Sequence, residues 1–564
     1  MKAHKMRWIF GLIAAMLVAS VMAVGCGPTE TPAPEVVVET EVVERTVEVP
    51  VEVEITSTPT PRGGTLVLAS NKYPSGLDPH VNVAWDVAYI LGSVYDTLVY
   101  QDSEGNFVPG LAEDWDVSDD GTVYTFYLRE DVTFHDGTTF DAEAVKYNFD
   151  RIVDPETGSQ KAAGLLGPFA GSEVVDEYTI EVTLEEPYAY LLHGLSMPYL
   201  GMASPEAIEE WGEEYQLHQV GTGPFMFDEF VPQDHLTLVP NPDYNWAPSI
   251  FAHEGPAYLD EVRWIFLPEP ATRAPALEAG DADIVLSLPA SDGNRVSNDP
   301  TLELSVSMLT GQPLFWFMNT EMPPTDDILV RQALIYGTDR QAAINAVLRG
   351  FYLQAHGPLA AASPEYTEAV TPMYPYDPQL AGELLDEAGW VDTDDDGIRD
   401  KDGEPLTVSM VLQGWGFISP LGELLQAQLR QIGVNVEMEQ LSWPGQMEVA
   451  IAGERNMPVM GGSGFFAYDA LNGFFHSSNA EGGFNWSKVQ DPELDALLEA
   501  GARTLDLEER QEAYGEAQVM IMEQALILPV YDYAFIAGVN SRVQGLSWDS
   551  TGLVPYLYDV YVEE

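Results

Sequence analysis

The stretch "VYDTLVYQDSEGNFVPGLAEDWDVSDDGTVYTFYLREDVTFHDGTTFDAEAVKYNFDRI", residues 94–152, carries two kinds of periodicity in one run. Apolar and polar residues alternate through residues 121–137, which predicts an antiparallel β-hairpin. Residues 140–153 then show helical spacing, and Asp141 stands where a helix N-cap is expected. Strand and helix signals therefore follow each other closely, as is typical of a mixed α/β protein.

The rest of the chain continues the alternation of strands and helices. A strand is predicted at residues 63–70, and an amphipathic helix followed by a strand is predicted at residues 419–443. Three further helices are predicted to begin at an Asp N-cap, at residues 339–350, 377–390 and 491–504. Roughly 500 residues are too many for one hydrophobic core, so two or three α/β lobes are expected.

The N-terminus has the features of a secretory leader that ends at a lipid-modified cysteine. Three basic residues in the first seven precede an uncharged apolar run at residues 8–25. The following "AVGC" resembles the bacterial lipobox, in which cleavage leaves Cys26 as the first residue, with lipid on its sulfur and its amine. Residues 1–25 are therefore predicted to be a lipoprotein signal peptide, and an uncleaved membrane anchor is the alternative.

Residues 26–62 are predicted to be the lipidated Cys26 and a disordered acidic tether. Val, Glu, Thr and Pro dominate the segment after Cys26, which has no aromatic residue. Prolines interrupt its Val/Glu alternation, which favours an extended solvated chain over a paired stalk. With either a lipid or an uncleaved anchor, the rest of the chain is expected to lie outside the cytoplasm.

The composition excludes several classes of function. The chain carries 90 acidic and 24 basic residues, a formal net charge of -66 at pH 7. Binding to nucleic acid and direct docking to anionic lipid both need a basic surface, so neither is expected. Cys26 is the only cysteine, so the rest of the chain has no thiol for an intramolecular disulfide, a zinc site or a nucleophile.

Nine sequence blocks, in order along the chain, resemble one protein family. They are "GTLVLAS", "LDPH", the opening stretch quoted above, "GTGPFMFDEF" with "LVPNPDYNW", "VRQALIYGTDRQAAINAVLRG", "YPYDPQLAGELLDEAGW", "LLQAQLRQIGVNVEM", "DPELDALLEAG" and "ILPVYDYAFIAGVNSRVQGL". From about residue 63 to residue 561 the chain resembles the extracytoplasmic solute-binding proteins, family 5, that serve peptide, nickel and opine ABC importers. The resemblance implies an α/β, periplasmic-binding-protein-like flytrap of type II, cluster C, with two lobes and an extra inserted domain.

The resemblance also implies how the chain is divided. Lobe I would take residues 63–105, 216–315 and 532–564, the inserted domain residues 106–215, and lobe II residues 316–531. The chain would cross between the lobes near residues 314–320 and 528–533. Two crossing strands make a hinge, because small changes in their dihedral angles move whole lobes.

A cleft between the lobes is the expected ligand site. By resemblance, its walls would come from residues 77–79, 315–319, 414–417 and 463–475. Within these segments we predict ligand contacts from Trp316, Asn319, Trp415, Phe465 and Phe466. The aromatic rings offer flat apolar faces and the Asn319 amide can both donate and accept hydrogen bonds. Each aromatic residue can instead belong to the core.

The residues that follow Phe465 leave the ligand class open. Peptide-binding members of the family carry a W-x-x-D pattern here, whose Asp pairs with the free amino group of the ligand. With Phe465 in the Trp place, Tyr468 takes the Asp place, and Asp469 matches the Asp of a following D-P turn. Tyr468 and Asp469 are predicted to contact ligand, which is an oligopeptide or an oligosaccharide. Nickel and haem are less favoured, because the His residues are scattered along the chain.

Residues 392–403, "DTDDDGIRDKDG", imitate a calcium-binding loop. Asp392, Asp394, Asp396 and Asp400 fall at positions one, three, five and nine, with Gly at position six. Position twelve is Gly, where such a loop carries a bidentate Glu. A structural Ca²⁺ is one prediction for these four Asp residues, and an acidic surface turn is the other. No cofactor is required in either case.

Together these features predict a binding protein and no enzyme. We expect a monomeric receptor, periplasmic or anchored to the outer face of the membrane by lipid alone. It would capture a small-molecule ligand and deliver it to ABC permease subunits, with ligand favouring the closed population of the lobes. One alternative is a secreted carbohydrate- or peptide-acting hydrolase with an aromatic-lined cleft, which needs catalytic residues that the sequence does not place. A surface chaperone or signalling receptor on the same fold is another.

Overall fold

The computed structural model describes residues 63–462 and 466–563, which belong to one compact unit of the chain. The signal peptide, the tether, lipidation at Cys26 and the ligand contact of Phe465 lie outside the described residues and stay predictions.

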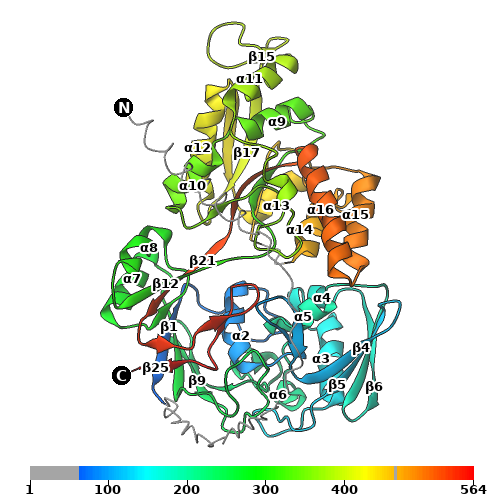
Figure 1. The fold of residues 1–564 in the computed structure, drawn as a ribbon, viewed down its shortest axis with the longest axis vertical. Coiled ribbons are helices and arrows are strands. Elements are labelled where there is room, and N and C mark those ends of the chain that lie inside the picture. The colour runs from blue at the N-terminus through cyan, green and yellow to red at the C-terminus, as the bar shows by residue number, and fades with distance from the viewer. Residues whose placement is uncertain (1–62, 463–465, 564) are drawn as a thin grey trace, which may run out of the picture. The chain divides into compact units, whose positions relative to one another are not determined.

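A seven-stranded sheet forms the first lobe, with strand order β12-β21-β11-β1-β10-β9-β8 (Figure 1). β1 pairs parallel with β10 and β11, and its run "LVLA" is buried except for the half-buried Val67, as expected of a central strand. The strands are β1 (Thr65–Ser70), β8 (Phe225–Val231), β9 (His235–Pro240), β10 (Glu261–Phe266), β11 (Ile284–Val285), β12 (Leu302–Met308) and β21 (Ala534–Asn540). Helices α7 (Pro270–Ala279), α8 (Ala290–Ser297) and α2 (Ala88–Val94) belong to this lobe.

The inserted domain contains a four-stranded antiparallel sheet, β4-β5-β7-β6. Its strands are β4 (Ala112–Val117), β5 (Val123–Leu128), β6 (Phe169–Asp176) and β7 (Thr179–Leu184), and its helices are α3 (Ala142–Val153), α4 (Lys161–Leu166), α5 (Leu191–Leu195) and α6 (Pro205–Trp211). The predicted hairpin at residues 121–137 is wrong, because β5 takes β4 and β7 as its partners. The later alternating residues form a turn, in which the Asp136 carboxylate accepts hydrogen bonds from the backbone N–H and hydroxyl of Thr138.

A partly buried ion pair joins the inserted domain to the first lobe. Arg151 on α3 donates to Asp78 at 2.6 and 3.0 Å, and its Nη1 lies 2.8 Å from Nδ1 of His80. Burial raises the pKa of Asp78, but the contacts with Arg151 and His80 more than offset this and leave the pKa below its usual value. The segment at residues 77–79, predicted to line the cleft, therefore supports this junction.

The second lobe contains a four-stranded sheet, β14-β20-β13-β19, and a separate parallel pair, β17-β18. The strands are β13 (Leu314–Phe317), β14 (Leu353–Gln354), β17 (Thr407–Gln413), β18 (Asn435–Leu441), β19 (Val459–Met460) and β20 (Ile527–Asp532). The helices are α9 (Ile328–Tyr336), α10 (Arg340–Leu348), α11 (Pro378–Glu387), α12 (Ile418–Gln431), α13 (Trp443–Ile451), α14 (Ala467–Phe475), α15 (Pro492–Arg503) and α16 (Leu507–Glu523).

Two segments connect the sheets of the lobes. β12 of the first lobe leads into β13 of the second, and β20 of the second leads back into β21 of the first (Figure 1). The crossings lie between residues 308 and 314 and at Tyr533. The exact domain boundaries stay a prediction, and the sheets support placing the changeovers at these two segments.

The predicted helix starts are confirmed. Asp141, Asp339, Asp377 and Asp491 all accept a backbone N–H from the first turn of their helices, at 2.9 to 3.0 Å. Each bond satisfies one of the N–H groups that a helix leaves unpaired at its start, which typically stabilises by about 1 kcal/mol. The helix and strand predicted at residues 419–443 are likewise present as α12 and β18.

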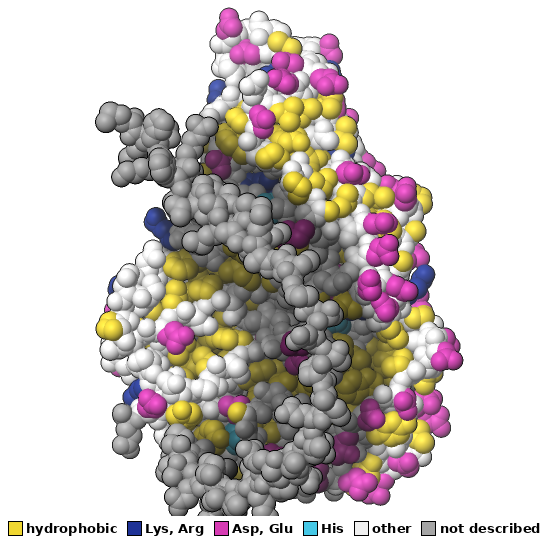
Figure 2. All heavy atoms as spheres, viewed as in Figure 1, with side chains coloured by type: hydrophobic (Ala, Val, Ile, Leu, Met, Phe, Trp, Pro, Cys, Tyr) yellow, Lys and Arg dark blue, Asp and Glu magenta, His cyan; other side chains and the backbone are white. Residues whose placement is uncertain are grey.

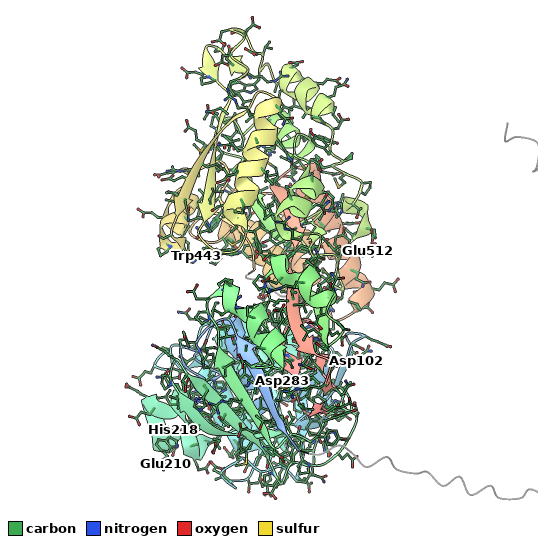
Figure 3. All side chains as sticks on the ribbon, turned by 90° about the vertical axis from the view of Figure 1, so that its left-hand side faces the viewer. Asp102, Glu210, His218, Asp283, Trp443 and Glu512 are labelled. Carbon is green, nitrogen blue, oxygen red and sulfur yellow. The ribbon has the colours of Figure 1, made fainter. Side chains whose placement is uncertain are left out.

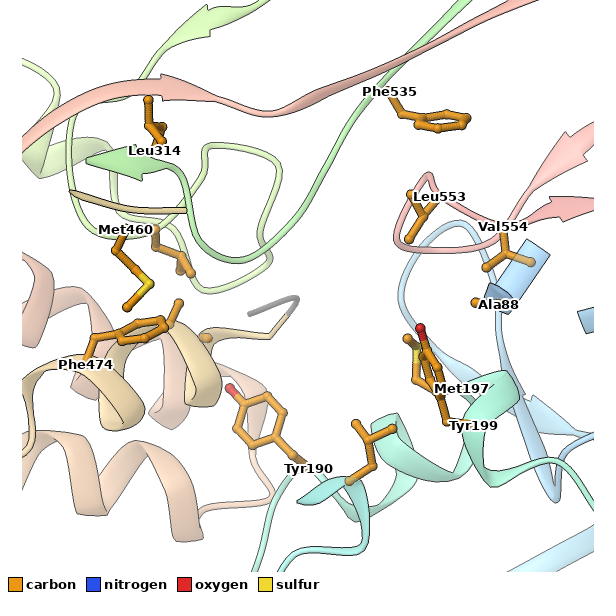
Figure 4. Packing of buried hydrophobic residues seen from close by; sticks show 14 of the residues in the cluster. Ala88, Tyr190, Met197, Tyr199, Leu314, Met460, Phe474, Phe535, Leu553 and Val554 are labelled. Carbon is orange, nitrogen blue, oxygen red and sulfur yellow. The ribbon is translucent and has the colours of Figure 1, made fainter. Parts of the chain in front are cut away.

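The core extends through both lobes, and the surface is acidic. Figure 4 shows Leu314, Met460 and Phe474 packed in the second lobe, with Tyr190 of the inserted domain reaching towards it. On the face shown in Figure 2, acidic side chains outnumber basic ones, especially along the edge formed by α15 and α16. Among residues 63–462 and 466–563, every helix falls short of the length or the apolarity needed to cross a bilayer.

Candidate functional site

A cavity of about 780 Å³ lies where the two crossing segments meet both lobes. We call it the hinge cavity. Its walls comprise residues 71, 72, 270, 273 and 287–291 of the first lobe, residues 309, 310, 312, 531 and 533–536 of the crossings and their strands, and residues 352, 415–417, 461 and 462 of the second lobe. A volume of this size accommodates a small organic solute.

Aromatic side chains form the wall of the hinge cavity that belongs to the second lobe. Tyr352, Tyr531 and Tyr533 make edge contacts with ring centroids 5.0 to 5.3 Å apart, and Phe417 lies 6.3 Å from Tyr352. Trp415 is 41% exposed, so its ring is available to a ligand. The next residue, Gly416, has φ +60°, a conformation that glycine adopts without strain.

The charged side chains on the hinge cavity are Lys72 and Arg273. Lys72 Nζ lies 3.2 Å from Asp86 Oδ1, and the Lys72 side chain is half exposed. Arg273 is buried, and its guanidinium donates to the backbone carbonyls of Leu267, Pro268 and Ser287 at 2.8 to 2.9 Å. The Arg273 side chain is therefore fixed by the loops that follow β10 and β11.

Tyr531 and Tyr533 flank Asp532 of β20, a carboxyl group whose pKa is raised. Asp532 is buried, its Oδ2 accepts the backbone N–H of Ala361 at 3.0 Å, and its Oδ1 has no hydrogen-bond partner. Burial raises the pKa of Asp532 to about 7, which the hydrogen bond from Ala361 only partly opposes. Asp532 is absent from the cavity wall to which its two neighbours belong, because successive side chains of a strand point to opposite faces.

A second cavity, of about 790 Å³, lies between the inserted domain and the second lobe. We call it the side cavity. Tyr468 and Asp469 at the start of α14 line it, together with Tyr188 of the inserted domain and Trp443 and Phe484 of the second lobe. Figure 3 shows Trp443 at the edge of the second lobe nearest the first. The charged residues that line the side cavity include Glu186, Asp469, Glu499, Lys161 and Arg503.

Hydrogen bonds join the two walls beside the side cavity. The Tyr190 hydroxyl donates to Glu365 Oε1 at 3.1 Å, and Arg510 Nε donates to the same oxygen at 3.0 Å. Both members of the Arg510–Glu365 ion pair are buried, and the guanidinium lies 5.4 Å from the Tyr190 ring centroid. The backbone N–H of Ala189 also donates to the carbonyl of Ala502 at 2.9 Å.

The structure separates the residues that the sequence predicted to share one site. Trp415 lies on the hinge cavity, whereas Tyr468 and Asp469 lie on the side cavity. Phe466 packs against Tyr190 and His193, with ring centroids 6.1 and 5.1 Å away. Ligand contact by these residues stays a prediction.

Trp316 and Asn319 belong to the core in place of the predicted ligand site. Trp316 is fully buried in β13, and its indole N–H donates to the carbonyl of Val411 at 2.9 Å. The Asn319 amide donates to the carbonyls of Gly453 and Arg455, and its oxygen accepts the N–H of Glu321. The hydrogen-bonding capacity of Asn319 therefore holds the chain around β13.

Sequence reasoning missed Tyr352, Arg273, Tyr531 and Tyr533 as cavity residues. The motif "YDY" at the end of "LPVYDY" carried a signal for the last two, because residues two apart in a strand share a face. Nothing in the sequence places Arg273 or Tyr352 beside them, since those residues come from separate segments.

The acidic loop brings three of its four Asp residues together. Carboxylate oxygens of Asp392, Asp394 and Asp400 lie within 4.8 Å of one another. The same groups also accept protein donors, including the backbone N–H of Thr393, which bonds to Asp400 at 2.9 Å. Asp396 instead accepts the N–H of Ile398 at 2.7 Å, as in an acidic turn. Calcium binding stays a prediction.

Comparison with known proteins identifies the family. The profile of bacterial extracellular solute-binding proteins, family 5 Middle, matches residues 106–484, and this chain belongs to that family. The fold is that of a type II periplasmic binding protein. Family 5 proteins are the periplasmic or extracytoplasmic solute-binding components of ABC importers.

Several relatives resemble the chain over most of its length. The glutathione-binding protein GsiB of Salmonella paratyphi A is 31% identical over 462 residues, which cover 80% of this chain and 86% of GsiB. The heme-binding protein A of Haemophilus influenzae is 30% identical over 531 residues, 88% of this chain and 91% of the relative. NikA from Brucella suis, in complex with Fe(III)-EDTA, superposes with a TM-score of 0.79 at 26% identity, covering 89% of this chain and all of NikA. These relatives are binding proteins of transport systems, not enzymes.

Proposed function

We propose that this chain captures a small solute in the hinge cavity and delivers it to the permease of an ABC importer. The observation that carries the proposal is the cavity of about 780 Å³ whose walls come from both lobes and both crossing segments. A solute that touches all three parts interacts more strongly when the lobes are closed, so it shifts the population towards the closed form. A permease can distinguish that form from the open one.

The walls of the hinge cavity support a solute with a flat or apolar body. Trp415 offers an exposed ring, and Tyr352 and Phe417 extend the aromatic surface. Oligopeptides and oligosaccharides both present such bodies, and both stay candidates. The glutathione-binding relative favours a short peptide-like solute.

The proposal includes a lipid anchor on Cys26. The sole cysteine of the chain follows an apolar leader directly, which supports lipidation at this position. Two or more acyl chains hold a protein stably at a membrane, since each buried CH₂ contributes about 0.8 kcal/mol. Metabolic labelling with palmitate should mark the full chain and not Cys26→Ala. Equal labelling of both chains would overturn the anchor and leave solute capture untouched.

A binding panel on the full chain in detergent tests solute capture. Short peptides including glutathione form one set, and oligosaccharides form the other. A solute at 100 times its dissociation constant should stabilise the folded protein by roughly 2.7 kcal/mol, which is measured as a rise in Tm. Mass spectrometry of the solute after incubation should show it unchanged.

Two results would contradict solute capture. Cleavage or modification of the solute would favour the hydrolase alternative. Absence of any Tm shift, together with the absence of copurified solute in native mass spectrometry, would remove the support for capture. A ligand-dependent complex with a sensor protein in place of a permease would favour a signalling role.

A further inference from the structure

We infer that the hinge cavity selects an anionic solute, one that carries a carboxylate or phosphate group beside a flat or apolar body. This inference rests on the proposed function and names the class of its substrate. The observation behind it is the set of charges on the cavity wall. Of the described residues that line the cavity, two are basic, Lys72 and Arg273, and none is Asp or Glu.

The lack of carboxylates is unexpected in this protein. Acidic residues make up 90 of 564 positions, about one in six, against 24 basic ones. The side cavity carries both signs of charge, since Glu186, Asp469 and Glu499 line it together with Lys161 and Arg503. Because carboxylates repel an anion and attract an ammonium group, the hinge cavity should favour an anion over a cation more strongly than the side cavity does.

Arg273 provides the buried positive charge of the hinge cavity. The residue is 8% exposed, and three backbone carbonyls accept its N–H groups. Within the described chain, no carboxylate forms an ion pair with it. Glu269, the N-cap residue of α7, attracts the guanidinium without forming an ion pair with it. A buried charge without an ion-pair partner is costly, so an anion that enters the cavity gains a further attraction.

Arg340 is a buried arginine that has a structural role and serves as a comparison for Arg273. It is also buried and also donates to backbone carbonyls, those of Ala355, Pro529 and Tyr374. However, Arg340 is not among the residues that line either cavity. Arg273 differs by its place on the wall of a cavity that is large enough for a solute.

Polar groups on the same wall support recognition of an anion. Lys72 adds a second cation, although Asp86 offsets part of its charge. The neighbouring Asn71 has a buried Oδ1 without a hydrogen-bond partner, which can accept from a hydroxyl or N–H on the body of the solute and not from its anionic group. The first residues of α7 and α8 also line the cavity, so the positive ends of two helix dipoles lie nearby.

The first test measures the electrostatic preference of each cavity without needing the natural solute. In the full chain with Cys26→Ser, Ser291→Cys places the only thiol at the hinge cavity, and Ser478→Cys places it at the side cavity. Both serines are exposed and line their cavities. Methanethiosulfonates that carry a sulfonate or a trimethylammonium group then report how fast an anion and a cation reach each thiol.

The ratio of anionic to cationic reaction rates should be at least about tenfold higher at position 291 than at position 478. The difference should shrink towards none at about 1 M salt, where charges are screened within about 3 Å. A neutral reagent corrects for access. Equal ratios at the two positions, or a lower ratio at 291, would overturn the charge preference.

The second test compares solutes that differ in one charge. N-acetyl-Ala-Phe-Ala with a free carboxylate should bind at least about tenfold tighter than its C-terminal amide, and cellobionate tighter than cellobiose. Lys72→Gln should reduce the ratio between the affinities for the charged and the neutral member of each pair. Equal or tighter binding of neutral members overturns the inference and leaves solute capture intact. If no solute binds, the proposal of solute capture is wrong. The ratio of anionic to cationic reaction rates at the two thiols then tests the charge preference of the cavity by itself.

Discussion

The hinge cavity and the side cavity are nearly equal in volume, about 780 and 790 Å³, yet their walls are built differently. Across the hinge cavity the lobes touch through apolar groups, since Phe351 and Tyr352 pack against the cluster that contains Leu288 and Val296. Beside the side cavity, hydrogen bonds from Tyr190 to Glu365 and from Ala189 to Ala502 join the walls, and the Arg510–Glu365 ion pair within the second lobe holds the Glu365 carboxylate in place. Volume alone therefore does not distinguish a ligand site from a junction.

The difference in contacts predicts which cavity can change its width. Apolar contacts are non-directional, so two surfaces can slide or separate with a gradual change in free energy. Buried hydrogen bonds and ion pairs are directional, and separating their partners leaves charges unpaired. We therefore expect solute capture by closure at the hinge cavity, and we interpret the side cavity as a structural junction.

The largest expected effect comes from breaking the buried ion pair that supports the junction at the side cavity. Arg510→Met removes one partner of a buried ion pair and leaves the Glu365 carboxylate without its counter-charge. We expect the free energy of unfolding to fall by about 3 to 5 kcal/mol. Denaturant titration of the full chain measures it. Solute affinity of the folded fraction should stay unchanged.

Arg503→Met is the matched control for that variant. Arg503 lines the same cavity, but its ion pairs with Glu186 and Glu499 are exposed, so its loss should cost less than about 1 kcal/mol. Equal effects of the two substitutions would mean that burial does not set the strength of this junction. A loss of solute affinity in Arg510→Met would show that the two cavities are coupled.

How much of this architecture the sequence predicts depends on the range of the interactions. Helix starts at Asp141, Asp339 and Asp377 are local signals, since the cap and the N–H it accepts are three residues apart. The strand β5 was predicted in place but with the wrong partner. Its true partners lie up to about 60 residues away along the chain, and alternation cannot name a partner at that distance.

The next largest expected effect is on the free energy of unfolding as a function of pH, and it concerns Asp532 in the strand beside the hinge cavity. Burial raises the pKa of this carboxyl to about 7, above the value near 3.9 of an unfolded Asp. The folded state therefore binds the proton more tightly. The contribution of the protonated Asp532 carboxyl to the free energy of unfolding is complete below about pH 4 and is lost as pH rises through 7. Above that pH it changes little.

Asp532→Asn removes this ionisation and keeps an oxygen that can accept the N–H of Ala361. At pH 8 the variant should be more stable than the natural chain by up to about 4 kcal/mol, and at pH 4 the two should be nearly equal. Unfolding free energies across that range measure the difference. A gap that is constant with pH would mean that Asp532 titrates normally in the fold.

Paired tryptophan substitutions compare the two cavities directly. Trp415→Ala in the hinge cavity should weaken solute binding by about 1 to 2 kcal/mol, which is roughly five- to thirtyfold in Kd, because a ring stacked on the solute is lost. Trp443→Ala in the side cavity should leave Kd unchanged. Both rings are similarly exposed, which makes them a matched pair. The reverse pattern would assign the solute to the side cavity.

The candidate site was harder to predict than the fold, and Trp316 and Trp415 show why. Both are aromatic residues in segments that the family resemblance placed at the cleft. Trp316 stands in a strand buried on both faces, whereas Trp415 stands between two glycines in a loop. The glycines beside Trp415 favoured exposure of its ring. The burial of Trp316 depends on elements from distant parts of the chain that pack over β13, and no local sequence pattern predicts that packing.

The smallest expected effect lies outside both cavities, in the acidic loop at residues 392–403. If Asp392, Asp394 and Asp400 bind Ca²⁺ with a dissociation constant of about 10⁻⁴ to 10⁻³ M, then 1 mM Ca²⁺ should stabilise the chain by roughly 0.4 to 1.4 kcal/mol. Asp394→Asn should abolish the shift in Tm, and Mg²⁺ at the same concentration should not reproduce it. No shift with Ca²⁺ would leave the loop as an acidic turn, held by bonds such as that from Thr393 to Asp400. Either result bears on the comparison, because a loop that gathers carboxylates at the surface contrasts with a hinge cavity that contains none among its described wall residues.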